Sequence, residues 1–210
     1  MWRILLADDH ALLRSGLRRI LEEALPGVQV GEAGTAEEAL AALPDGAWDL
    51  LILDISMPGR SGLDILPDLK ALQPNLPIVV LSMFGEQQFA IRALKAGASA
   101  YLTKERAPEE LIQAVRTVLG GRRYIGASLA EALAAHVSMD REGAPHERLS
   151  PREFEVLRLI AAAKTASEIA EELGLSVKTV STYRARILEK MQLSTNAELM
   201  QYALRHGLVE

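Results

Sequence analysis

The chain has 210 residues, of which 49% are hydrophobic and 24% charged, and its formal net charge is −5. This balance is typical of folded globular proteins, and the length suits one ordinary domain plus a small one. Cysteine is absent from the sequence, which excludes disulfides, thiolate zinc sites and thiol nucleophiles and fits a reducing cytoplasm. Every apolar run is shorter than the roughly 18 residues of a transmembrane helix, so we expect no membrane partner.

The first 120 residues alternate short aliphatic runs with stretches of helical periodicity. The expected strands are 3–7, 28–33, 50–53, 78–81 and 100–102. The expected helices are about 12–25, 36–43, 63–72, 86–96 and 108–119. In the first helix, Leu12, Leu17 and Leu21 are expected on one buried stripe. Runs that are apolar on both faces favour a covered parallel sheet, so the pattern predicts an α/β, doubly wound, five-stranded parallel sheet with its ligand site at the carboxyl ends of the strands.

Polar side chains stand where these strands end. Asp8 and Asp9 follow the first strand, Asp54 the third, Ser82 the fourth and Lys104 the fifth. Three converging carboxylates repel one another and need a cation, and hard oxygen ligands suit Mg²⁺. An aspartate can attack phosphorus to form an acyl phosphate, while a metal ion and a lysine neutralise the phosphoryl oxygens.

The segment from Asp54 reads Asp54-Ile55-Ser56-Met57-Pro58-Gly59-Arg60-Ser61-Gly62-Leu63. With the acidic pair, Ser82 and Thr103-Lys104 in register, it resembles the receiver domain of response regulators over about residues 2–120. The resemblance implies that Asp54 accepts a phosphoryl group from a sensor histidine kinase and that Lys104 pairs with that group.

The same resemblance assigns the remaining groups at this edge. It implies that Mg²⁺ is held by Asp8, Asp9, Asp54 and the backbone carbonyl of Ser56. Ser82 and Tyr101 look like the hydroxyl and aromatic pair that switches on phosphorylation, although Tyr101 could also be a plain packing aromatic. Such a domain phosphorylates itself and slowly loses the phosphate, as a switch and not as a metabolic enzyme.

Two other functions remain open from the residues alone. A Mg²⁺-dependent phosphohydrolase of the haloacid-dehalogenase kind also uses a strand-end aspartate, but it usually needs a second acid where this chain has Ser56. A protein-interaction switch with a degenerate second domain is the other alternative. His10, beside the acidic pair, is expected to flank the first helix and not to bind metal.

A linker is expected after Gly120 and Gly121, which end the last of these helices. The predicted domains are a receiver over 1–121, a linker over 122–147 with a possible helix at 128–136, and a DNA-binding domain over 148–210. Their net charges are −5, −1 and +1, so contact with DNA phosphates has to come from a local basic face.

Only helices are expected after Leu149. Ser150-Pro151-Arg152-Glu153 predicts an N-cap, a first-turn proline and a capping-box glutamate. Further helices are expected at about 166–173, 177–191 and 196–205. The second and third are joined by a tight turn at Gly174, as in a helix-turn-helix.

This small four-helix domain resembles the NarL/LuxR type of DNA-binding domain. The matching residues are Leu149-Ser150-Pro151-Arg152-Glu153, Val156-Leu157, Glu168-Ile169-Ala170, Leu173, Ser176, Lys178-Thr179-Val180, Ile187 and Lys190-Met191. Ala163 stands where relatives usually have glycine, and Tyr183 where many have histidine.

The third helix is the expected reader of double-stranded DNA. Val177, Val180 and Ile187 are expected to point inward, with Leu188 and Met191. By family register the residues that face the bases are Ser181, Thr182 and Ala185. The residues expected at phosphates or groove walls are Lys178, Thr179, Arg184, Arg186 and Lys190. One such domain makes few contacts, so a homodimer on two half-sites is expected.

Overall fold

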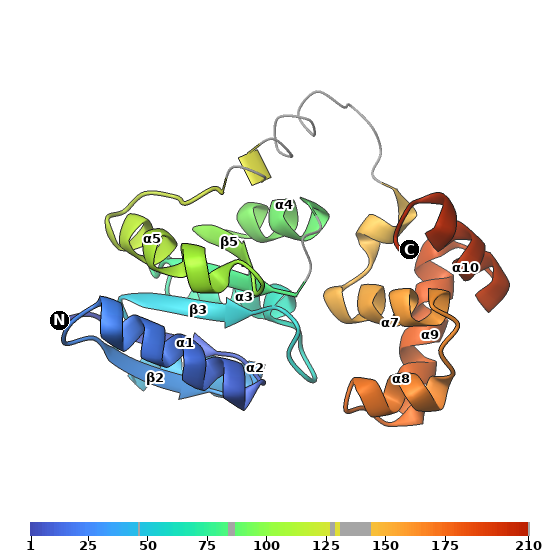
Figure 1. The fold of residues 1–210 in the computed structure, drawn as a ribbon, viewed down its shortest axis with the longest axis horizontal. Helices are drawn as coiled ribbons and strands as arrows, with labels where there is room; N and C mark the ends of the chain where they lie inside the picture. The colour runs from blue at the N-terminus through green and yellow to red at the C-terminus, as the bar shows by residue number, and fades with distance from the viewer. Residues whose placement is uncertain (46, 84–86, 127–128, 131–143, 210) are drawn as a thin grey trace. The chain divides into compact units, whose positions relative to one another are not determined.

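The structure is a computed structural model that describes residues 1–45, 47–83, 87–126, 129–130 and 144–209. The chain divides into two compact units, Met1–Asp140 and Arg141–Glu210, both visible in Figure 1, and each is described by itself. The helix predicted at 128–136 and much of the predicted linker lie outside the described residues. The domain limits 1–121, 122–147 and 148–210 therefore stay a prediction.

The first unit contains the predicted parallel sheet. Its strands are β1 (Arg3–Ala7), β2 (Gln29–Ala33), β3 (Leu50–Asp54), β4 (Ile78–Ser82) and β5 (Ala100–Thr103). All neighbours are parallel and their order is β2-β1-β3-β4-β5, which confirms the doubly wound fold. Strands β3 and β4 are buried at every residue, because helices cover both faces of the sheet (Figure 1).

The covering helices are α1 (Ala11–Ala24), α2 (Ala36–Asp45), α3 (Gly62–Leu72), α4 (Gln87–Lys95) and α5 (Ala107–Leu119). Helices α1 and α5 contact each other, and their buried residues form one core cluster with strands β1, β3, β4 and β5. Leu17 and Leu21 belong to this cluster as predicted, but Leu12 is 89% exposed. The prediction for Leu12 was wrong because a helix turns by about 100° per residue, which places Leu12 about 140° from Leu17.

The second unit contains helices and no strand in its described residues. It contains a short 3₁₀ helix, η1 (Pro145–Arg148), and then α7 (Pro151–Ala161), α8 (Ala166–Glu172), α9 (Val177–Met191) and α10 (Asn196–Arg205). The four α-helices were predicted and η1 was not. Capping boxes begin α7, α8 and α10, which satisfies backbone N–H groups that a helix end would otherwise leave unpaired.

Helix α9 packs against α7 and α8. The turn before it contains Gly174 with φ +64°, a left-handed conformation that glycine adopts without a steric penalty. Val180, Ile187 and Met191 are buried as predicted, whereas Val177 is 47% exposed. Val177 lies only about 60° around the helix from Val180, so the wheel gives its direction correctly. The wheel does not show how far the neighbouring helices extend along α9.

Candidate functional site

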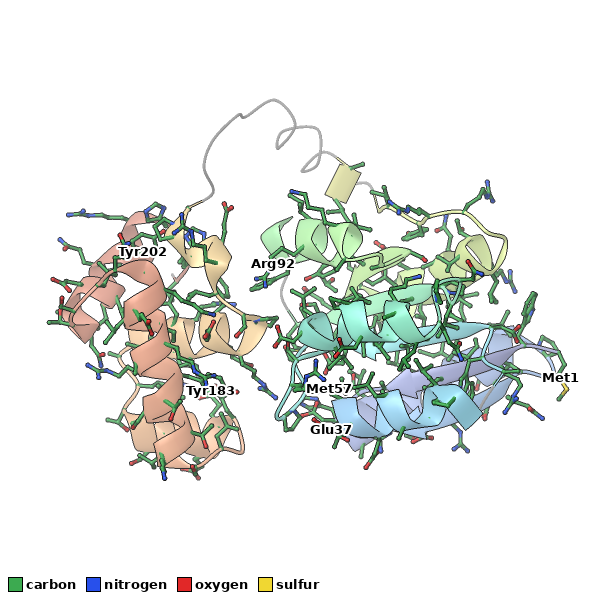
Figure 2. The ribbon with its side chains drawn as sticks, turned by 180° about the vertical axis from the view of Figure 1, so that it is seen from behind. Met1, Glu37, Met57, Arg92, Tyr183 and Tyr202 are labelled. Carbon is green, nitrogen blue, oxygen red and sulfur yellow. The ribbon has the colours of Figure 1, made fainter. Side chains whose placement is uncertain are left out.

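The sheet register brings the polar strand ends of the first unit to one edge. Ala7 of β1 pairs with Leu53 of β3, so Asp8 and Asp54 each lie one residue beyond that pair. On the other side of β3, Asp54 pairs with Leu81. Figure 2 labels Met57, just after β3, at this end of the unit, and Met1 at the opposite end of the sheet. Neighbouring parallel strands therefore present their carboxylates side by side.

A lysine holds the two buried carboxylates together. The Lys104 Nζ lies 2.7 Å from Asp54 Oδ2 and 2.8 Å from Asp8 Oδ2. Both aspartate side chains are fully buried and that of Lys104 is 3% exposed. The second oxygen of each carboxylate accepts a backbone hydrogen bond, from the Ser56 N–H at 3.0 Å to Asp54 and from the His10 N–H at 2.8 Å to Asp8. Asp54 is thus fixed by one ammonium and one amide.

This environment changes the acidity of Asp54 and Lys104. Burial, with the charge of Asp8, raises the pKa of the Asp54 carboxyl to about 6, although Lys104 and the Ser56 N–H act in the opposite direction. For Lys104, burial opposes the charged form, but Asp54 and Asp8 outweigh it and raise the pKa of the ammonium. At pH 7.5 Asp54 is therefore mainly ionised, as a nucleophile must be.

Two more groups complete a cluster that can hold a metal ion. Asp8, Asp9, His10 and Asp54 each offer a ligand atom, and these atoms lie within 4.8 Å of one another. The His10 Nδ1 lies 2.7 Å from Asp9 Oδ1, and His10 is the N-cap residue of α1 without a side-chain cap bond, so it flanks that helix as predicted. Buried carboxylates outnumber the one buried ammonium here, so the donor set fits a hard divalent cation such as Mg²⁺.

The backbone next to Asp54 leaves no room for a side chain at Gly62. A Cβ on Gly62 would lie 2.1 Å from the Asp54 carbonyl oxygen. Helix α3 therefore starts directly against the strand end, with the Gly62 N–H donating to the Ile55 carbonyl at 3.2 Å. The Ser61 side chain caps the helix by accepting from the Asp64 N–H at 3.1 Å.

The predicted switch residues belong to the next two strands. Ser82 is fully buried at the end of β4 and pairs with Thr103. Its carbonyl accepts the Lys104 N–H at 2.7 Å, so β4 also positions Lys104. Tyr101 pairs with Val80 and is only 6% exposed. The ring of Tyr101 is thus inside the unit in this structure.

In the second unit, α9 presents the predicted base-facing side chains to solvent. Ser181, Thr182 and Ala185 are all exposed. The Ser181 hydroxyl donates to the Val177 carbonyl at 2.9 Å, and the Thr182 hydroxyl donates to the Lys178 carbonyl at 3.0 Å. Both hydroxyls therefore use their hydrogen within the helix and offer oxygen lone pairs outward as acceptors.

The residues predicted at phosphates fall into two groups. Lys178, Thr179 and Arg186 line a hollow of about 270 Å³ together with Thr182 and Tyr183, whereas two others are engaged within the domain. The Arg184 Nε donates to Asn196 Oδ1 at 2.5 Å, and the Lys190 Nζ donates to Glu153 Oε2 at 2.6 Å.

Tyr183 was not predicted among the DNA-facing residues, yet it lines this hollow. Figure 2 shows it on α9, the central helix of this unit. The helical spacing could have found it, because Tyr183 lies four residues after Thr179 and three before Arg186. Two cations, two hydroxyls and a phenol in one hollow suit an anionic backbone.

Comparisons with known proteins identify both units. Residues 4–116 match the family described as response regulator receiver domain, and residues 147–203 match the bacterial regulatory proteins of the luxR family. The chain belongs to the response regulators with a LuxR-type DNA-binding domain. It is 37% identical to the response regulator UvrY of Escherichia coli, over 99% of this chain and 96% of that protein. It is also 37% identical to the response regulator GacA of Pseudomonas aeruginosa, over 100% and 99%.

Solved response regulators share the fold. RcsB of Salmonella typhimurium has 30% identity and a TM-score of 0.60, over 96% of this chain and 97% of that one. A LuxR-family response regulator from Aurantimonas has 34% identity and a TM-score of 0.61, over 65% and 98%. RcsB has also been solved bound to promoter DNA with the phosphomimetic BeF₃⁻. Family membership sets the phosphohydrolase alternative aside. In the described part of the chain, no helix is long and apolar enough to cross a membrane.

Proposed function

We propose that Asp54 is the phospho-acceptor of this response regulator and that a sensor histidine kinase supplies the phosphoryl group. A carboxylate oxygen of Asp54 attacks the phosphorus of the phosphohistidine. The bond from phosphorus to nitrogen breaks, and its electron pair returns to the imidazole, which takes a proton. The single observation that carries this proposal is the buried Asp54 carboxyl at a strand end with the Lys104 Nζ 2.7 Å away.

The neighbouring groups share the charge that arrives with the phosphoryl group. Asp8, Asp9, Asp54 and the Ser56 carbonyl would hold Mg²⁺, which neutralises phosphoryl oxygens when bound. Lys104 leaves its carboxylate partners for a phosphoryl oxygen. Ser82 and Tyr101 then move as the switch pair. Each chain takes one phosphoryl group and slowly hydrolyses it, which is the behaviour of a switch and not of a metabolic enzyme.

The output of the switch is binding of double-stranded DNA by a homodimer. Helix α9 enters the major groove of each half-site with Ser181, Thr182 and Ala185 toward the bases. The phosphates are contacted by flanking cations such as Lys178 and Arg186. Support comes from the exposed position of these residues and from the structural relative RcsB, solved as two dimers on two parallel DNAs.

A labelling experiment tests the acceptor. The purified chain is incubated with acetyl phosphate and Mg²⁺ and its phosphate is counted by mass spectrometry. We expect one phosphoryl group on the wild type and on the exposed-site control Asp64→Asn, and none on Asp54→Asn. Acid-labile, hydroxylamine-sensitive phosphate retained by Asp54→Asn would refute the assignment.

A selection experiment tests the output. Duplexes are recovered from a random pool with wild-type protein, with and without acetyl phosphate, and sequenced. We expect paired half-sites about one helical turn apart, recovered more efficiently after phosphorylation. Coupling in such switches is about 1–3 kcal/mol, so affinity should rise about 5–150-fold. Equal recovery with and without phosphorylation would contradict the proposed control of DNA binding.

A further inference from the structure

The last basic residue of α9 is held by a buried carboxylate of another helix. Lys190 is in the final turn of α9, and its Nζ donates to Glu153 Oε2 at 2.6 Å. The two residues lie 37 positions apart in the chain. The side chain of Glu153 is 3% exposed and that of Lys190 is 41% exposed. The ammonium is therefore anchored from the domain interior and reaches solvent on one side only.

Glu153 has a second task that fixes its position. It is the third residue of α7, where its Oε2 accepts the Ser150 N–H at 2.7 Å, and its own N–H donates to Ser150 Oγ at 3.3 Å. This capping box holds the carboxylate against the first turn of α7. A negative charge is favoured at a helix N-terminus and a positive charge at a helix C-terminus, so each helix end also favours its member of the pair.

We propose that Lys190 is a positioning residue for DNA recognition: its ion pair with Glu153 fixes α9 on α7, and its charge does not neutralise a DNA phosphate. This inference rests on the proposed DNA-binding function. Contact with a phosphate would draw the ammonium away from Glu153 and leave a buried carboxylate without its cation, which is strongly unfavourable. The phosphate cations of α9 are instead Lys178 and Arg186, which line the exposed hollow.

The orientation of α9 decides the base contacts, because α9 supplies all the proposed base-facing groups. Ser181, Thr182 and Ala185 are small, so each reaches a base only if the helix lies at the correct depth and angle. The pair ties the C-terminal turn of α9 to the N-terminal turn of α7, and the buried Val180 and Ile187 anchor the middle of α9. Loss of the ion pair should therefore weaken the base contacts and leave the number of phosphate contacts unchanged.

The salt dependence of binding separates the two roles. Binding of full-length protein to a duplex recovered by the selection is measured by fluorescence anisotropy at several salt concentrations. We expect Lys190→Gln to weaken binding by about 5- to 30-fold with the slope of log K against log salt unchanged, and Lys190→Arg to restore most of the affinity. The matched control Lys178→Gln should reduce the slope by about 0.9, the value for one phosphate contact.

The double variant checks that Glu153 is the partner. If the pair acts as a unit, Glu153→Gln combined with Lys190→Gln should cost no more affinity than the more damaging single change. Additive losses would overturn the proposal. So would a slope reduced by about 0.9 in Lys190→Gln, or an affinity equal to that of the wild type. Absence of binding by the wild type with every duplex would instead contradict the DNA-binding function itself.

Discussion

Replacement of Asp54 by asparagine should stabilise the first unit at neutral pH when no divalent cation is bound. The folded state raises the pKa of Asp54 from 3.8 to about 6, which corresponds to about 3 kcal/mol against folding once the carboxyl is ionised in both states. Asparagine removes that charge but keeps only one accepting oxygen. It therefore loses either the Ser56 or the Lys104 hydrogen bond, which costs about 1 kcal/mol. The net gain should be about 2 kcal/mol at pH 8.

The sign of the stability difference between Asp54→Asn and the wild type reverses with pH. A carboxyl whose folded pKa is raised contributes most to stability below its unfolded pKa, and that contribution is lost as the pH rises through its folded pKa. The wild type should therefore lose this stability between about pH 4 and pH 6, while Asp54→Asn should not. Below about pH 4 the variant should be slightly the less stable of the two.

The assay uses urea unfolding in EDTA from pH 4.5 to pH 8. Both tryptophans of the chain, Trp2 and Trp48, lie in the first unit, so tryptophan fluorescence reports this unit. The exposed-site control Asp64→Asn should change the unfolding free energy by less than about 0.5 kcal/mol. Added Mg²⁺ should stabilise the wild type more than Asp54→Asn. A stability difference between Asp54→Asn and wild type that is independent of pH would refute this account of the site.

Two further changes test the backbone at the two sites. Ala163 has φ +61° at the end of α7, a left-handed conformation that is strained for alanine. Ala163→Gly should therefore stabilise the second unit by about 0.5–1 kcal/mol in urea unfolding followed by circular dichroism. A loss of stability would show that the backbone at Ala163 is not strained. Gly62→Ala should destabilise the first unit by more than about 2 kcal/mol and reduce labelling of Asp54, because the new Cβ would overlap the Asp54 carbonyl. The control Gly16→Ala, which meets no atom within 4 Å in α1, should stabilise the unit by about 0.5–1 kcal/mol, and similar effects at both glycines would count against the close approach.

The parallel sheet could be predicted from the sequence because the residue patterns that indicate its strands are local. Strands β3 and β4 read as apolar on both faces, Asp54 stands where the β3 run stops, and Lys104 directly follows β5. Once parallel strands are inferred, their carboxyl ends must meet, and the Asp54–Lys104 contact follows across 50 positions of the chain. The pKa of about 6 could not be predicted, because it depends on how completely the helices bury Asp54.

The predictions for helix faces were less complete for a different reason. Periodicity shows which way a side chain points, but not what the neighbouring element offers there. Val177 points near the buried face of α9 yet remains 47% exposed. Lys190 lies about 60° around α9 from the buried Ile187, and its ammonium meets the carboxylate of Glu153. The spacing of α9 alone could not distinguish a cation that is available to DNA from one already used within the domain.

Three charged groups that meet at the candidate site, Asp8, Asp54 and Lys104, stand at the carboxyl ends of the first, third and fifth strands. No segment shorter than residues 8–104 contains all three groups. A nascent chain still on the ribosome presents Asp8 and Asp54 before Lys104 has been synthesised, and the two carboxylates then lack the ammonium that joins them. If Asp54 is the acceptor proposed above, competence to take a phosphoryl group is acquired only when the sheet has been synthesised as far as Lys104 and has folded, so unfinished or misfolded copies would not be phosphorylated.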